Sequence, residues 1–116
     1  MNLPPIDYTN GAALVTGGTS GIGQEVALEL IKRGVKRIVI VARGAADLDQ
    51  AATRLRSINQ ACEIHTISAD LSKPEAIEQV RQEVEALGWP IEILVNNAGF
   101  ARKYVFAENL ARVRTH

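Results

Sequence analysis

Residues 16–23 read TGGTSGIG, and this glycine-rich stretch decides how the rest of the sequence is interpreted. The apolar run AALV (12–15) precedes it, and the amphipathic run QEVALELIKRG (24–34) follows it. We interpret these three stretches as a strand, a tight turn and a helix. Because the first amides of a helix lack internal partners and carry partial positive charge, a glycine turn at this place predicts an anion-binding site.

The glycines of this stretch have separate expected roles. Gly17 permits a tight turn, Gly21 lets the backbone approach a phosphate, and Gly23 lets the helix pack close to the strand. Hydroxyl donors are added by Thr19 and Ser20. The phosphate loop of nucleotide hydrolases ends in Lys followed by Ser or Thr, whereas Gln24 and Glu25 follow these glycines, which disfavours a nucleoside triphosphatase.

Short runs rich in Val and Ile alternate with amphipathic segments along the chain. The expected strands cover residues 12–16, 37–42, 63–69 and 91–96. The helical segments between them have apolar stripes made by Ile22, Val26 and Leu30, by Leu48, Ala52 and Leu55, and by Ile77, Val80, Val84 and Leu87. The strands are apolar enough to be buried on both faces. This alternation predicts an α/β fold, a Rossmann-like doubly wound parallel sheet truncated to about four strands in the order 3-2-1-4, with flanking helices.

Local signals predict where the helices begin and end. In SKPE, Ser72 is expected to cap the third helix while Glu75 reaches back to it, with Pro74 in the first turn. Gly34 and Gly88 are expected to follow helix ends.

Composition limits the classes of function. A chain of 116 residues with 47% hydrophobic and 22% charged residues predicts a single domain over residues 1–116. Thirteen basic and thirteen acidic residues cancel and are scattered, so we expect neither a nucleic acid nor a membrane as partner. Cys62 is expected to be a small buried thiol, and His65 and His116 to be structural. The absence of an apolar leader favours a cytoplasmic protein.

Three motifs together resemble those of the short-chain dehydrogenase/reductase family. They are TGGTSGIG (16–23), ADL (69–71) after the third strand and NNAG (96–99) after the fourth. The resemblance implies an oxidoreductase that transfers a hydride between a nicotinamide dinucleotide and a small carbonyl or alcohol substrate. It also implies that Asp70 contacts the adenine and Leu71 lines the adenine pocket. By the same resemblance, Asn97, Ala98 and Gly99 border the ribose, and the asparagine pair braces the sheet.

The end of the second strand predicts which dinucleotide binds. An NAD site places an acidic residue about 20 residues beyond the glycine loop to bind the ribose hydroxyls. Ala42 occupies this place and Arg43 follows it, offering a guanidinium that can pair with a 2′-phosphate. The sequence therefore favours NADP over NAD. The complete set of predicted cofactor-binding residues is Gly17, Thr19, Ser20, Gly21, Ile22, Gly23, Arg43, Asp70, Leu71, Asn97, Ala98 and Gly99.

The resemblance covers only an amino-terminal half of the family's pattern. Its catalytic Tyr, the Lys four residues later and the upstream Ser have no counterparts here, because Tyr104 is followed four residues later by Glu108 and Tyr8 by Ala12. We therefore assign no catalytic residue. Two interpretations stay open: an NADP-dependent oxidoreductase that depends on groups supplied by another copy, and a dinucleotide-binding module or truncated fragment without turnover.

The fourth strand is predicted to be an open edge. In the expected order, Ile93 and its neighbours would face solvent unless something covers them. Residues 99–116 form a tail that suits a short amphipathic helix through Val105, Phe106, Leu110 and Val113. We expect a homo-oligomer, most simply a two-fold dimer, with the fourth strand or the tail at its interface.

Overall fold

Four parallel strands form the centre of the molecule. The computed structural model of the chain describes residues 11–19 and 21–97. The strands are β1 (Ala12–Thr16), β2 (Arg37–Ala42), β3 (Glu63–Ser68) and β4 (Ile91–Asn96). They lie in the order β3-β2-β1-β4, and every neighbouring pair is parallel, which confirms the predicted topology.

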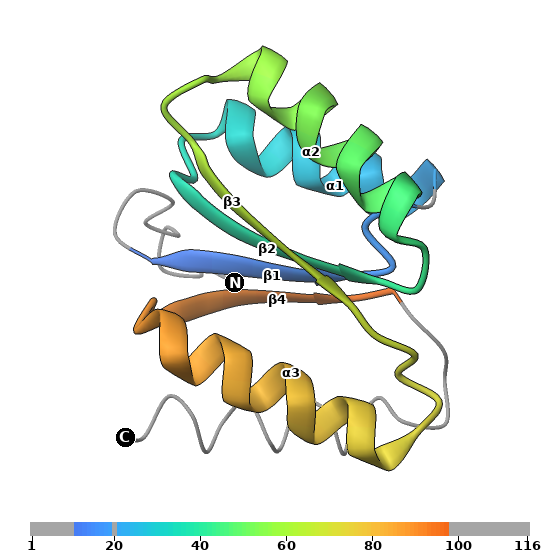
Figure 1. Cartoon of the computed structure of the whole chain (residues 1–116). Coiled ribbons are helices and arrows are strands. Elements are labelled where there is room, and N and C mark those ends of the chain that lie inside the picture. The colour runs from blue at the N-terminus through green and yellow to red at the C-terminus, as the bar shows by residue number, and fades with distance from the viewer. Residues whose placement is uncertain (1–10, 20, 98–116) are drawn as a thin grey trace, which may run out of the picture.

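Three helices connect the strands and cover both faces of the sheet. They are α1 (Gly21–Lys32), α2 (Ala45–Ile58) and α3 (Pro74–Leu87). Figure 1 shows α1 and α2 packed on one face of the sheet and α3 on the other. This arrangement follows from right-handed crossovers, because the chain moves outward from β1 to β3 and then returns past β1 to β4.

The core consists of two apolar clusters separated by the sheet. Successive side chains of a strand point to opposite faces, so Ala13 and Val15 of β1 join the cluster under α1 and α2, whereas Ala12 and Leu14 join the cluster under α3. The predicted apolar stripes of α2 and α3 face the sheet: Leu48, Ala52, Leu55, Ile77, Val80 and Val84 are buried, and Leu87 is partly buried against the cluster under α3. Cys62 is also buried, and this burial raises the pKa of its thiol.

The predicted apolar stripe of α1 is partly wrong. Ile22 is 73% exposed, and the buried side of the helix is instead made by Gly23, Ala27, Leu28, Leu30 and Ile31. Small residues at 23 and 27 allow this face to approach the sheet closely, and a search for large apolar residues passes over them. Ile22 is consequently left on the outer side of the first turn.

Burial differs between the central strands and the edge strands. All five residues of β1 and four consecutive residues of β2 are buried, as predicted. The same expectation is wrong for β3 and β4, where most residues are half-buried or exposed, because each strand has only one neighbour in the described sheet. On β4, Ile93 and Val95 are partly buried against the cluster under α1 and α2, and Leu94 is the more exposed residue at 36%.

The predicted capping box at the start of α3 is wrong. Lys73 occupies the N-cap position and no side chain caps the helix, because the Ser72 hydroxyl donates to the carboxylate of Asp70 instead. Pro74 begins the helix as expected. Gly34 and Gly88 follow helix ends with φ angles of 106° and 69°, in the left-handed region where glycine is favoured.

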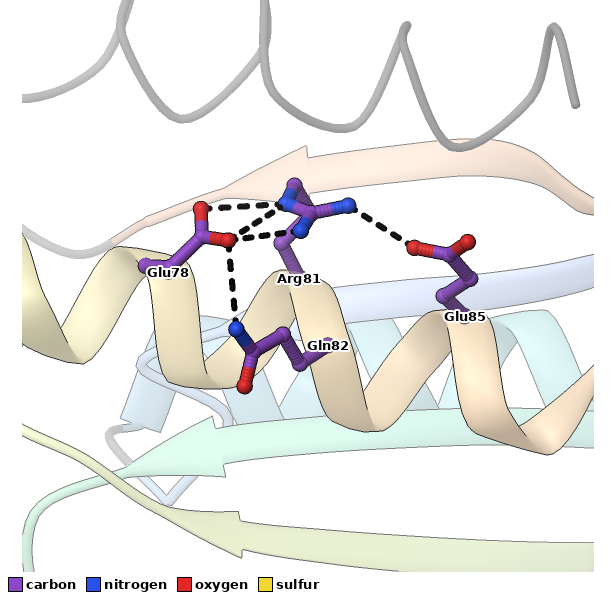
Figure 2. Close-up of polar contacts among 4 residues, drawn as sticks. All are labelled: Glu78, Arg81, Gln82 and Glu85. Carbon is purple, nitrogen blue, oxygen red and sulfur yellow. Dashed lines mark hydrogen bonds and ion pairs between the residues drawn. The ribbon is translucent and has the colours of Figure 1, made fainter.

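The outer side of α3 is held by a network centred on Arg81. Its guanidinium donates to Glu78 one turn before it, at 2.6 Å from Nη2 to Oε1, and to Glu85 one turn after it, at 2.8 Å from Nη1 to Oε2 (Figure 2). Gln82 Nε2 also donates to Glu78 Oε1. Spacings of three and four residues place these groups side by side on a helix, so the network supports α3 itself.

Several expectations concern residues outside the described ranges. They include the tail over residues 99–116, Tyr8, Tyr104 and His116. Among the described helices, none is long and apolar enough to cross a membrane. The homo-oligomer stays a prediction.

Candidate functional site

The turn after β1 begins with a glycine in a backbone conformation that other residues rarely adopt. Gly17 has a φ of 68°, which L side chains rarely adopt. Its N–H donates to the carbonyl oxygen of Val41 at 2.8 Å, so the turn is fastened to the carboxyl end of β2 as well as to β1. The turn therefore leaves the sheet at a fixed angle and leads directly into α1.

The first turn of α1 lies against this glycine. A Cβ on Gly23 would lie 2.9 Å from the carbonyl carbon of Gly17 and closer still to its oxygen. The same Cβ would lie 3.2 Å from Nδ2 of Asn97, which follows β4. Three segments that are far apart in sequence thus meet at the carboxyl edge of β1.

Gly21 differs from Gly23 in its surroundings. Among the described residues, no heavy atom lies within 4 Å of the position of a Cβ on Gly21, apart from its chain neighbours and the nearby backbone of α1 itself. Gly21 is exposed at the amino end of α1, next to the exposed Ile22, and Thr19 before it is half-buried. The helix terminus therefore faces open space that a phosphate group could occupy.

Thr16 joins β1 to the end of β4. Its side chain is fully buried, and Oγ1 donates to Oδ1 of Asn96 at 2.9 Å. The same oxygen accepts a hydrogen bond from the backbone N–H of Asn97 at 2.9 Å. This hydroxyl fixes the start of the segment after β4 relative to the glycine turn.

The glycine turn lies where the direction of the chain reverses in the sheet. From β1 the chain crosses to β2 and β3 over one face, and it later returns to β4 over the other face. At such a switch point the neighbouring connections leave in opposite directions and open a crevice at the carboxyl ends of the strands. This topology predicts a ligand site between β1 and β4, next to Gly17.

A hollow lies at the carboxyl ends of β2 and β3. It has a volume of about 400 Å³ and is lined by Arg43, Ser68, Ala69, Asp70, Lys73, Glu75, Ala76 and Gln79. Ser68 Oγ donates to the backbone oxygen of Arg43 at 2.8 Å, and Ala69 N–H donates to the backbone oxygen of Ala42 at 2.9 Å. These bonds hold the segment that presents Arg43 against the end of β3, while its side chain stays exposed.

Asp70 is an ionised acceptor in this hollow. The hydroxyl and the backbone N–H of Ser72 donate to its Oδ1, and these bonds hold the pKa of the Asp70 carboxyl below its usual value. The positive charges of Arg43 and Lys73 act in the same direction. At neutral pH Asp70 therefore carries a negative charge and can only accept hydrogen bonds.

The structure brings most of the predicted residues to one edge of the sheet. Gly17, Gly23 and Asn97 meet at the switch point, and Arg43 and Asp70 line the hollow beside it. Leu71 is buried in the core cluster under α3 and does not line the hollow. The predicted residues Ser20, Ala98 and Gly99 lie outside the described ranges.

Sequence analysis missed four polar residues of this edge. They are Thr16, Ser68, Ser72 and Lys73, of which Ser72 was assigned as a helix cap. A signal for Thr16 was available, because a polar residue that ends a fully apolar strand needs a partner when it is buried. Within the described part of the chain, no group of three or more His, Cys, Asp or Glu side chains could hold a metal ion.

Comparison with known proteins agrees with this geometry. The family model described as short chain dehydrogenase matches residues 11–113. The chain belongs to the short-chain dehydrogenase family. The matched residues include the glycine turn, the residues that line the hollow and Asn97 after β4.

Individual relatives are longer than this chain. The very-long-chain 3-oxoacyl-CoA reductase of Bos taurus is 38% identical over 92 residues, which are 79% of this chain and 28% of that protein. A 3-oxoacyl-(acyl-carrier-protein) reductase of rhamnolipid biosynthesis from Pseudomonas aeruginosa is 41% identical over 96 residues, 83% of this chain and 36% of that protein. The chain thus spans about a third of the length of these curated relatives.

Solved structures of the family share the fold. L-sorbose reductase from Gluconobacter frateurii, complexed with NADPH and L-sorbose, superposes with a TM-score of 0.75 at 30% sequence identity. The alignment covers 91% of this chain and 46% of that chain.

The close approach at Gly23 predicts a large cost for one added carbon. We expect Gly23→Ala to lower the free energy of unfolding by about 1–3 kcal/mol, because the methyl group must displace the Gly17 backbone. Urea denaturation measures the change. Gly21→Ala is the matched control, and its open surroundings predict a neutral or slightly stabilising effect, up to about 1 kcal/mol. Equal effects of the two changes would contradict the packing described.

The Thr16 hydrogen bonds predict a second effect on stability. Thr16→Val keeps the shape of the side chain but removes the donor to Asn96 and the acceptor for Asn97, so we expect a loss of about 1–3 kcal/mol. Thr53→Val is the control, because Thr53 is exposed on α2 and, among the described residues, its hydroxyl bonds only back to Asp49 of the same helix. Its effect should stay within about 0.5 kcal/mol in the same denaturation experiment. A Thr16→Val variant as stable as this control would show that the hydroxyl is dispensable.

Proposed function

We propose that this chain binds NADP(H) as the cofactor-binding part of a short-chain dehydrogenase that interconverts a small carbonyl compound and an alcohol. The single observation that carries the proposal is the glycine turn at the switch point of the sheet. There the left-handed Gly17, the close contact at Gly23 and the open space at Gly21 coincide. Further support comes from relatives whose names state a reductase and from a neighbour complexed with NADPH.

The residues of the turn fit the pyrophosphate of a dinucleotide. Backbone N–H groups at the start of an α-helix carry partial positive charge, and α1 begins shortly after the end of β1. No side chain fills the space at Gly21, so two phosphate groups could approach these donors closely. In this proposal Thr19 and Ser20 add hydroxyl donors, and the backbone of Ile22 and Gly23 adds further N–H groups.

Arg43 is proposed to hold the 2′-phosphate that distinguishes NADP from NAD. It follows β2, whose end is fastened to the glycine turn by the Gly17 to Val41 hydrogen bond. Ala42 supplies no carboxylate that would compete for the ribose hydroxyls or repel a phosphate. An exposed guanidinium at this place can form paired, charge-assisted hydrogen bonds with a phosphate.

The remaining predicted residues surround the nucleoside parts of the cofactor in this proposal. Asp70 lies at the adenine end, in the hollow, and Leu71 follows it with its side chain buried in the core cluster under α3. Asn97, and beyond it Ala98 and Gly99, border the other ribose, and Thr16 positions the start of that segment. NADPH, when bound, supplies a hydride to the substrate carbonyl. This chain's part is to bind and orient that group at the open end of the crevice beside β4.

The proposal has an alternative within the same binding site. A dinucleotide-binding module without turnover would use the same turn, hollow and arginine. Reduction of a panel of aldehydes and ketones, followed at the NADPH absorbance, distinguishes the two. Turnover above that of a variant with a blocked glycine turn supports the enzyme, and binding without turnover supports the module.

The open space at Gly21 generates a test of cofactor binding. Gly21→Val places a branched side chain in the proposed phosphate path, so we expect dinucleotide binding to be lost while the free energy of unfolding changes little. Calorimetry with NADPH measures the affinity. Ala86→Val is the control, because Ala86 is an exposed helical position near the carboxyl end of α3, at the opposite edge of the sheet. Unchanged affinity in Gly21→Val would refute the proposed phosphate site.

Arg43 generates a test of the choice between NADP and NAD. Arg43→Ala removes the proposed phosphate partner, and Ala42→Asp introduces a carboxylate next to it. Loss of a charge-assisted pair is worth roughly 1.5–3 kcal/mol, so we expect the ratio of the two dissociation constants to shift by about one to two decades toward NAD. Arg33→Ala, at the far end of α1 beside Glu29, should leave the ratio as it is. If both site variants keep the original preference, the assignment of Arg43 fails.

A further inference from the structure

Helix α3 leaves part of its own face of the sheet open over β4. The cluster under α3 takes buried side chains from β1, β2 and β3, but within the described residues only Ile91, at the start of β4, comes from the fourth strand. Leu94 has Leu14 of that cluster as its register partner. Its neighbours Ile93 and Val95 pack on the other face, so Leu94 points toward the α3 side. Leu94 is nevertheless 36% exposed, which leaves an apolar floor incompletely covered beside α3.

The side of α3 that lies toward β4 carries the Arg81 network. Glu83 lies on the opposite side of the helix, because its Oε2 is 4.0 Å from Nε2 of His65 on β3. A step of two residues turns an α-helix by about 200°, so Arg81 faces away from β3. Since β3 and β4 are the two edges of the described sheet, Arg81 lies on the β4 side. Figure 2 shows its partners Glu78 and Glu85 on the same side of the helix.

Leu94, Glu78, Arg81 and Glu85 together form a surface that we call the β4 shelf. The side chains of Glu78 and Glu85 are 47% and 46% exposed, and the single guanidinium of Arg81 is shared between them. The shelf therefore has an excess of negative charge beside an apolar side chain. A partner that fits it has a stripe of apolar side chains with basic side chains beside the stripe.

Residues 99–116, which follow the described part of the chain, have the opposite charge balance. They contain four basic residues and one acidic residue, whereas α3 contains four acidic residues and one basic residue. Strand β4 ends at Asn96, at the carboxyl edge of the sheet where α3 begins. A helix of about 14 residues is about 21 Å long, and a strand of 6 residues is about 20 Å long. The segment is therefore long enough to run back along β4 over the shelf.

The order of apolar and basic residues in this segment also fits the shelf. On a helix, Phe106, Leu110 and Val113 would form one stripe, because they are spaced by four and three residues. Lys103 and Arg114 would lie beside that stripe, seven residues before its centre and four residues after it. The one acidic residue of the segment, two residues before the centre, would lie on the opposite side.

We infer that residues 99–116 dock as an amphipathic helix on the β4 shelf of their own chain, with the apolar stripe over Leu94 and with Lys103 and Arg114 toward the two glutamates of the shelf. An attached segment meets the shelf at a much higher effective concentration than a second copy of the chain does, which favours this occupant. Docking leaves the hydrogen-bonding edge of β4 open, so the homo-oligomer would use that edge. The inference does not depend on the proposed function.

Hydrogen exchange of the full chain measures the docking. Backbone amides of residues 102–115 are followed by mass spectrometry, with the free peptide 99–116 as the reference. We expect exchange in the chain to be slower than in the peptide by on the order of tenfold or more. Leu94→Asp places a charge in the apolar floor and should remove most of this protection. Ile58→Asp is the matched control, because Ile58 is an apolar residue of α2, 45% exposed and on the other face of the sheet, and it should leave the protection unchanged.

An exchange of charges tests the orientation of the segment without changing an apolar residue. Arg114→Glu should speed exchange of the segment by about two- to fivefold, the usual contribution of one exposed ion pair. Adding Glu85→Lys should restore the protection, because it recreates the pair with reversed signs. Glu83→Lys is the control, because Glu83 also has a partner within the chain, His65, but lies on the β3 side. It should restore nothing.

Three outcomes would overturn the inference. Exchange as fast as in the free peptide would show that the segment does not dock. Equal protection in Leu94→Asp and the unmodified chain, or equal restoration by Glu85→Lys and Glu83→Lys, would remove the docking site from the β4 shelf. Protection that rises with protein concentration, together with a dimer in light scattering, would place the segment on a second copy. If Leu94→Asp does not fold, the exchange of charges alone decides the site.

Discussion

The backbone of Gly17 lies so close to the first turn of α1 that residue 23 has no room for a β-carbon. This contact fixes how α1 leaves β1, and therefore where the helix terminus points relative to the carboxyl edge of the sheet. A larger residue at 23 would move the helix outward and weaken the contact of Ala27 and Leu30 with the core under α1 and α2.

The same point of the fold ties the two halves of the sheet together. Strand β1 pairs with β2 on one side and with β4 on the other, and the Thr16 hydroxyl adds two bonds across the β1–β4 boundary at its carboxyl end. The direction in which the chain crosses the sheet reverses at this point, and hydrogen bonds hold both neighbours of β1 at its carboxyl end. In the proposed site, backbone held in this way would lose little conformational freedom when a phosphate binds.

The charge at the proposed site comes from a few nearby groups and not from the net charge of the chain. Basic and acidic residues cancel over the whole chain, so no long-range field attracts a dinucleotide. The positive groups of the proposed site are the amino end of α1, Arg43 and Lys73, and each lies at the carboxyl end of a strand or at the start of a helix. Elsewhere, acidic and basic side chains pair along helices, as Arg81 does with Glu78 and Glu85, and such pairs support the helix.

The sequence by itself determined the α/β class, the order of the four strands and the place of the glycine turn. These features depend on local patterns: apolar runs of strand length, helical stripes such as Ile77, Val80 and Val84, and glycines where the backbone must turn or approach closely. Arg43, Asp70 and Asn97 could be named because each directly follows a predicted strand, and parallel strands end at one edge. Only the tertiary structure decided the buried face of α1, the exposure of β3 and β4, and the partners of Thr16, Ser68 and Ser72. The physical reason is that a hydroxyl can bond to any of several donors and acceptors. Which of them lies within hydrogen-bonding distance is set only when segments remote in sequence have packed together.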